Sequence, residues 1–70
     1  MSERRVIVYP GEDGYWVVEC PSLPGCVSQG KTKDEALANI KEAITLYIES
    51  LEAHGDTIPQ ETVETYLVTV

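Results

Sequence analysis

Apolar residues follow three successive patterns along the chain. The first consists of two short runs rich in β-branched and aromatic residues, at positions 6–9 and 15–20, which flank a turn cluster containing Gly11 and Gly14. This arrangement predicts a β-hairpin, because glycine adopts positive φ without a steric penalty and such runs favour strands. Pro10 ends the first run, since proline cannot donate to a strand ladder.

The second run has two different faces, because successive side chains of a strand point to opposite sides. One face is wholly apolar and is expected to pack against a helix; it consists of Trp16, Val18 and Cys20. The other face ends in a carboxylate and is expected to be half solvated; it consists of Tyr15, Val17 and Glu19.

A proline-rich corner follows the hairpin. Pro21 and Pro24 force the chain out of the sheet, and Gly25 allows it to turn back sharply. Residues 26–29 are then long enough for a short third strand, which Gly30 closes.

The second pattern predicts a helix from Lys33 to about Ala53. Thr32 and Glu35 have the spacing of a capping box, in which Thr32 caps the Glu35 amide and Glu35 reaches back to the Thr32 amide. Gly55 lies near the position where a helix end favours a left-handed residue. Apolar residues recur at spacings of three and four and form one broad stripe: Ala36, Leu37, Ile40, Ala43, Ile44, Tyr47, Ile48 and Leu51.

The third pattern is an alternation over residues 62–70 that predicts a final strand, with Tyr66, Val68 and Val70 on one face. The element order is therefore β-β-β-α-β, and a right-handed crossover would place the last strand beside the first and parallel to it. We expect one α+β domain over residues 1–70. Its architecture would be a two-layer sandwich, with one helix on one face of a four-stranded mixed sheet.

The other face of that sheet has no covering element in the chain. A domain of 70 residues has only a small core, and self-association is one way to stabilise it. An uncovered sheet face or a free edge strand is suited to that purpose. We therefore expect a homo-oligomer, either a dimer or a tetramer.

The charge balance narrows the possible partners. Twelve acidic residues against five basic ones give a net charge of −7 at pH 7. This balance disfavours nucleic-acid binding, which depends on clustered Lys and Arg. It suits a basic protein partner through electrostatic steering, although many proteins are acidic simply for solubility. No apolar run approaches the roughly 20 residues that a membrane span needs.

Residues that could carry chemistry are few. Cys20 and Cys26 are interpreted as buried free thiols of a reducing cytoplasm, with a disulfide between them as the less favoured alternative. No apolar signal-type segment follows Met1, which favours the same compartment. A zinc site would need more sulfur or imidazole ligands than these cysteines and the distant His54 supply. With no phosphate-binding glycine loop either, we expect no catalytic residues, metal or cofactor.

Two motifs together cover most of the chain. Residues 13–30, DGYWVVECPSLPGCVSQG, contain a Gly-aromatic strand and a Pro-x-Leu-Pro-Gly-Cys corner, and residues 32–44, TKDEALANIKEAI, form a capped helix start. Ile58-Pro59 follows as a linker after the helix. From residue 6 to residue 70, this pattern resembles the HicB antitoxin family.

The resemblance implies a degenerate ribonuclease H-like fold without nuclease activity. It also implies a partner, a small basic HicA-type toxin whose active site the antitoxin covers; such toxins are mRNA interferases with a double-stranded-RNA-binding-like fold and a catalytic histidine. Many family members carry a C-terminal DNA-binding segment. The chain stops at Val70 without one, so direct DNA binding is not expected. The alternative is an orphan oligomeric domain that binds a small molecule or another protein and has no toxin.

The uncovered side of the predicted hairpin offers candidate partner-binding residues. An aromatic residue and two acids lie there beside an apolar residue, and we expect this group to contact the partner: Asp13, Tyr15, Val17 and Glu19. The alternative is that the same residues cover the sheet within a homodimer.

Overall fold

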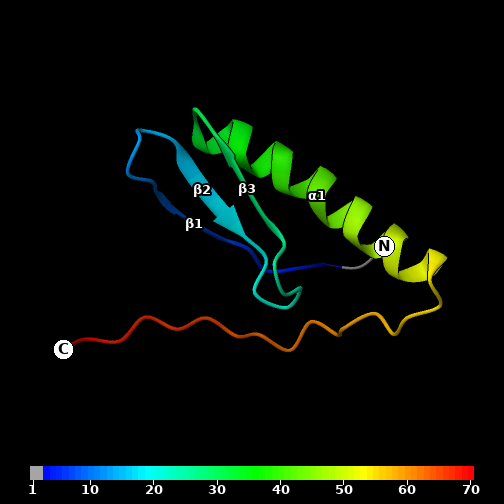
Figure 1. Cartoon of the computed structure of the whole chain (residues 1–70). Helices are drawn as coiled ribbons and strands as arrows, with labels where there is room; N and C mark the ends of the chain where they lie inside the picture. Colours follow the sequence, from blue (N-terminus) through cyan, green and yellow to red (C-terminus); the bar gives the residue numbers. More distant parts are fainter. Residues whose placement is uncertain (1–2) are drawn as a thin grey trace.

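The computed structural model describes residues 3–70. Three strands precede one long helix: β1 (Ile7–Pro10), β2 (Trp16–Glu19), β3 (Val27–Gly30) and α1 (Lys33–Ala53). The strands form an antiparallel sheet in the order β1-β2-β3, and α1 packs on one face of it, chiefly against β3 and β2 (Figure 1). The predicted α+β class and the order of these four elements are confirmed.

The core lies between α1 and the sheet. The side chains that it buries almost completely come from β2, the corner after it, and the first turns of the helix; they are Val18, Cys20, Leu23, Cys26, Ala36 and Ile40. Trp16 is partly buried against this cluster, and the Lys33 ammonium lies 4.7 Å from the centre of its ring. The apolar face predicted for β2 therefore does meet the helix.

The corner between β2 and β3 is compact and closes one end of the core. The Cys20 amide donates to the Cys26 carbonyl, the Leu23 amide to the Cys20 carbonyl and the Cys26 amide to the Leu23 carbonyl, each at 3.0 Å. Gly25 adopts φ +79°, which permits the turn between them. Leu23 is completely buried, and both cysteines are buried free thiols, as expected.

The start of α1 differs in one contact from the predicted capping box. The Thr32 hydroxyl accepts from the Glu35 amide at 3.1 Å, as expected, but the Glu35 carboxylate accepts from the Lys31 amide at 3.1 Å. The prediction that Glu35 would bind the Thr32 amide was wrong. Gly30 lies so close to the helix that a Cβ there would clash with the backbone of Glu35 and Ala36.

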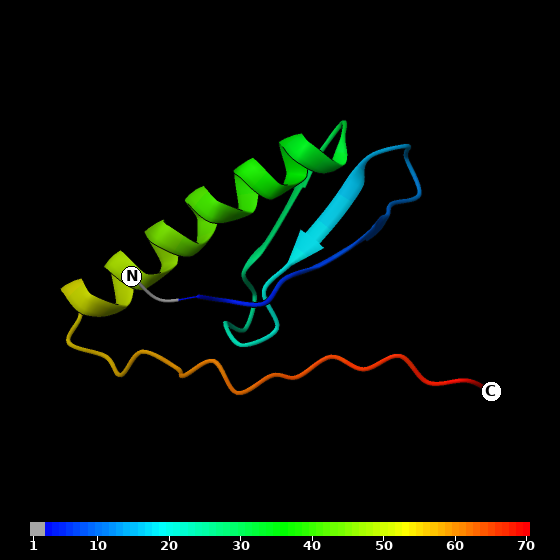
Figure 2. The same cartoon turned by 180° about the vertical axis from the view of Figure 1, so that it is seen from behind.

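The end of α1 follows the predicted pattern. Gly55 adopts φ +70° and its amide donates to the Glu52 carbonyl at 3.1 Å, while the Asp56 amide donates to the Leu51 carbonyl at 2.9 Å. This pair of bonds is a Schellman motif, which satisfies carbonyls of the last helical turn. After this motif the chain turns back and runs past the residues that precede β1 (Figure 2).

The segment expected to form the fourth strand is extended, but it pairs with no strand in the described part of the chain. It leaves the end of α1, passes the corner and then runs away from the sheet in both views (Figures 1 and 2). The Arg5 amide, just before β1, donates to the Glu61 carboxylate at 2.6 Å. The Glu61 side chain therefore lies between the two backbones, whereas the backbones of paired strands lie about 4.8 Å apart. The four-stranded sheet is not confirmed.

No helix within residues 3–70 combines the length and the apolar character that a membrane crossing requires.

Replacing Gly30 by Ala should strongly destabilise the fold. A Cβ there would lie 2.5 Å from the Ala36 amide nitrogen and 2.8 Å from the Glu35 carbonyl carbon. Because backbone rather than a flexible side chain is in the way, we expect a loss of about 1–3 kcal/mol in urea unfolding. Lys31→Ala, at the exposed next position, is the control and should stay within about 0.5 kcal/mol of the unsubstituted chain. Equal stability of the two variants would contradict the close approach.

Candidate partner-binding surface

The sheet face turned away from α1 carries side chains from all three strands. The strand register places Ile7 opposite Glu19, and Glu19 opposite Val27, in one row. A second row is formed by Tyr9, Val17 and Gln29. We call these six residues the open face: Ile7, Tyr9, Val17, Glu19, Val27 and Gln29.

The open face is mainly apolar and partly exposed. Ile7, Tyr9 and Val27 are 37%, 41% and 50% exposed, and Val17 and Glu19 on the central strand are half-buried. Apolar side chains gathered around a single carboxylate can bind a protein surface by burying area while the carboxylate sets orientation.

The structure divides the four predicted partner-binding residues into two groups. Val17 and Glu19 lie at the centre of the open face. Asp13 and Tyr15 lie at the end of the hairpin, where the Tyr15 amide donates to the Asp13 carboxylate at 3.2 Å and the Gly11 amide donates to the Tyr15 carbonyl at 2.7 Å. Asp13 thus shapes the turn, and its exposed carboxylate borders the face.

Sequence reasoning missed the contributions of the two outer strands. These are the residues that β1 and β3 add to the open face: Ile7, Tyr9, Val27 and Gln29. Period-two alternation assigns Ile7 and Tyr9 to one side of β1, and that signal was available. It does not say which side faces the helix, because the pairing register decides this and a shift by one residue exchanges the faces.

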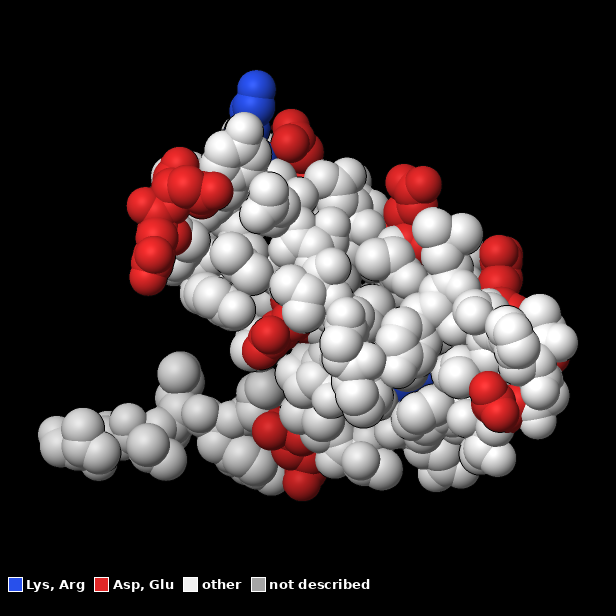
Figure 3. Space-filling view, in the orientation of Figure 1, with Lys and Arg blue, Asp and Glu red and all other residues white. Residues whose placement is uncertain are grey.

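Among the charged side chains on the visible surface, acidic ones predominate (Figure 3). Figure 3 shows carboxylates spread over the molecule, with a group near the turn between β1 and β2 and very few basic side chains. The distribution agrees with the net charge of −7. A basic partner approaching the hairpin would therefore meet favourable potential.

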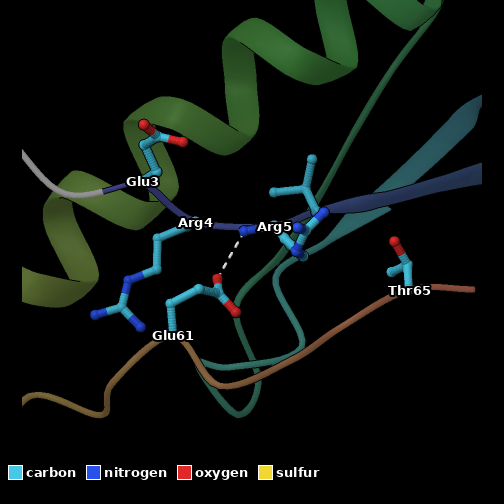
Figure 4. A pocket seen from close by; sticks show the side chains of 6 residues that line it. Glu3, Arg4, Arg5, Glu61 and Thr65 are labelled. Atoms are coloured by element: carbon cyan, nitrogen blue, oxygen red, sulfur yellow. Dashed lines mark hydrogen bonds between the residues drawn. The ribbon is translucent and has the colours of Figure 1, made fainter.

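A second polar feature joins the residues before β1 to the segment that follows α1. The Glu61 carboxylate accepts from the Arg5 amide at 2.6 Å (Figure 4). It also accepts from the Val63 amide at 3.2 Å and from the Ser22 hydroxyl at 3.3 Å. The Arg4 guanidinium in turn donates to Ser22 at 3.2 Å. We call this group the Glu61 junction.

The Glu61 junction favours the ionised carboxylate. The hydrogen bond from the Arg5 amide is the largest cause that lowers the pKa of Glu61 below its ordinary value of 4.5, and desolvation opposes it in part. The Val63 amide, the Ser22 hydroxyl and the Arg4 charge act in the same direction as the Arg5 amide.

Within residues 3–70, no three His, Cys, Asp or Glu side chains gather as a metal site would require. The surface just described is instead that of a small two-layer α+β domain with an exposed, acidic-bordered sheet face. Comparison with known proteins gives this domain a family. Residues 5–69 match the family described as "HicB_like antitoxin of bacterial toxin-antitoxin system", and the chain belongs to that family.

Individual relatives agree with the family assignment. A UPF0150 protein of Thermoplasma acidophilum is 61% identical over 59 residues, which cover 84% of this chain and 86% of that protein. A UPF0150 protein of Archaeoglobus fulgidus is 52% identical over 44 residues, or 63% of this chain and 64% of that protein. The crystal structure of the N-terminal domain of the Burkholderia pseudomallei antitoxin HicB is similar at a TM-score of 0.68 and 31% identity, covering 91% of this chain and 69% of that one.

Acidification should release the Glu61 junction. Because the pKa of Glu61 is lowered in the folded chain, the stabilisation it supplies is present above the ordinary value of 4.5 and is lost as the pH falls through the folded-state pKa. The Arg5 amide resonance, followed by NMR, should shift in that window and lose protection from hydrogen exchange. Glu61→Gln should abolish this transition, and Glu64→Gln, an exposed neighbour, should leave it intact. A transition that persists in Glu61→Gln would contradict the assignment.

Proposed function

We propose that this chain is the antitoxin of a HicAB-type pair, which binds a small basic mRNA interferase and covers its active site. Membership in the HicB-like antitoxin family carries this proposal. The family also suggests that the chain acts by binding and not by catalysis. The likeness to an antitoxin's N-terminal domain supports the same role for this fold.

The proposed contact is the open face together with the turn that borders it. Val17 and Glu19 supply an apolar patch and a carboxylate at the centre, and Asp13 and Tyr15 extend the surface at the hairpin end. The toxin must present basic side chains to bind RNA, so its active-site surface complements this acidic border. Apolar burial would then supply most of the affinity, and charge would set the association rate and orientation.

The proposal includes the working form of the antitoxin. We propose that it acts in the cytoplasm as a dimer or tetramer, with a complete four-stranded, ribonuclease H-like sheet. The free outer edge of β1 and the exposed apolar C-terminal segment support this, because neither has a partner in the described part of the chain. Uncovered apolar strand segments promote association.

Charge reversal on the open face should weaken toxin binding. In the double variant Asp13→Lys, Glu19→Lys, two attractive charges become repulsive, and we expect the dissociation constant to rise at least about tenfold. Affinity is measured by calorimetry against the protein encoded by the adjacent reading frame. The matched control is Glu42→Lys, Asp56→Lys, two exposed acids outside the open face that give the same change in net charge.

The comparison of the two double variants separates local contact from long-range attraction. Equal weakening in both would show that net charge alone matters, and unchanged affinity in the first would exclude the open face as the toxin contact. If no short basic reading frame with a lone histidine adjoins the gene, the orphan domain becomes the better description.

A further inference from the structure

The segment at residues 66–70 exposes four large apolar side chains. Tyr66, Leu67, Val68 and Val70 are 77%, 103%, 79% and 117% exposed, and no strand in the described chain pairs with this stretch. Tyr66, Val68 and Val70 share one face of an extended chain, since strand side chains alternate. The segment therefore has the pattern of a strand that lacks its sheet.

The same molecule also has a free strand edge beside an apolar groove, which could accept such a strand. β1 pairs only with β2, so its outer edge is free within residues 3–70. Beside that edge, an open groove of about 830 Å³ runs between the start of β1 and the helix. Its lining is largely aliphatic and includes Val6, Leu37, Ile40, Ile44 and Ile48. A strand added to the β1 edge would direct every second side chain into this groove.

The groove also contains polar groups that fit a strand. Arg4 lines it, and the Arg4 Nε is buried without a hydrogen-bond partner in the described part of the chain. A carbonyl of an added strand could accept from this nitrogen, which would remove the cost of burying it unpaired. The charged lining of the groove is balanced, with Arg4 and Lys41 on the basic side and Glu49 and Glu52 on the acidic side.

The chain's own segment is held away from this edge. The Arg5 amide donates its hydrogen bond to the Glu61 carboxylate and not to the backbone of another strand. A cavity of about 450 Å³ separates residues 3–6 from the segment at Glu61 and Thr65 (Figure 4). Beyond Thr65 the segment diverges from β1 in both views (Figures 1 and 2). Strand pairing needs a much closer approach of the two backbones.

We propose that residues 65–70 add as a strand to the β1 edge of a second copy of this chain. Tyr66, Val68 and Val70 occupy the groove of that copy, and the second copy's segment does the same in return. Each sheet then has four strands. Such reciprocal exchange is a common route to symmetric dimers, because every chain both donates and accepts the same element.

This inference rests on the proposed self-association and specifies its surface; it does not require a toxin. The toxin contact on the open face stays available, because the exchanged strand uses the edge of β1 and the helix side of the sheet. The antitoxin alone is therefore sufficient for the test.

The first measurement is the oligomeric state by sedimentation equilibrium from about 1 to 200 μM. We expect a dimer or a tetramer built from it. Val68→Asp should raise the dissociation constant about 100-fold, because the exchanged strand would bury a carboxylate in an aliphatic groove. Thr69→Asp, the same charge on the opposite face of the segment, should have little effect. Both positions are exposed in the single chain, so circular dichroism should show an intact helix in each.

The second measurement locates the contact by disulfide trapping. A copy with Leu37→Cys is mixed with a copy with Val68→Cys under mild oxidation, and we expect a disulfide-linked heterodimer. Glu42→Cys, which lies outside the groove, replaces Leu37→Cys as the control and should not cross-link. The natural cysteines are buried and should not react.

The outcomes are distinct. A monomer at every concentration would overturn self-association itself. A dimer that Val68→Asp leaves unchanged would overturn strand exchange while keeping self-association through another surface. A Leu37→Cys, Val68→Cys double variant that cross-links within a monomer would show that the segment pairs with its own sheet.

Discussion

The contact between Gly30 and the first turn of α1 determines the arrangement of the rest of the molecule. The absence of a side chain at Gly30 lets the end of β3 lie against the backbone at Glu35 and Ala36. The helix therefore begins directly over the sheet, and two residues of its first turns, Ala36 and Ile40, reach the core with almost no exposed surface. Because α1 is long and straight, this starting point fixes which strands it covers and which it leaves free.

Two surfaces remain uncovered as a result. Since α1 packs chiefly on β3 and β2, one face of the sheet has no layer over it, and the outer edge of β1 is free within residues 3–70. The two surfaces differ in chemistry. The open face combines apolar side chains with acids, which suits a basic protein, whereas the groove beside β1 is largely aliphatic and suits an alternating apolar strand. The proposed toxin contact and the proposed strand exchange therefore use different surfaces of the domain.

The success of sequence reasoning differed from one element to the next. The helix bounds, the left-handed residue Gly55 at its end and the inward face of β2 were predictable, because each depends on residues close together in the chain. The open-face residues of β1 and β3 were not, since they depend on pairing register. Val17 and Glu19 were found and Ile7 and Val27 were missed for that reason. The predicted hydrogen-bond donor to the Glu35 carboxylate was wrong by one residue, the Lys31 amide in place of the Thr32 amide. That contact depends on the close approach of Gly30 to the helix.

The sequence by itself determined the α+β class, the four elements from β1 to α1, the acidic charge and the family, because local spacing and composition encode all of these. The tertiary structure decided where the C-terminal segment goes. The alternation of its residues predicts a strand, but it does not specify which strand the segment pairs with or whether that strand belongs to the same chain. Only the positions of Glu61, Arg5 and the free β1 edge show that the segment stands apart from its own sheet. Strand pairing is a contact between distant residues, so it is decided by geometry that no single segment contains.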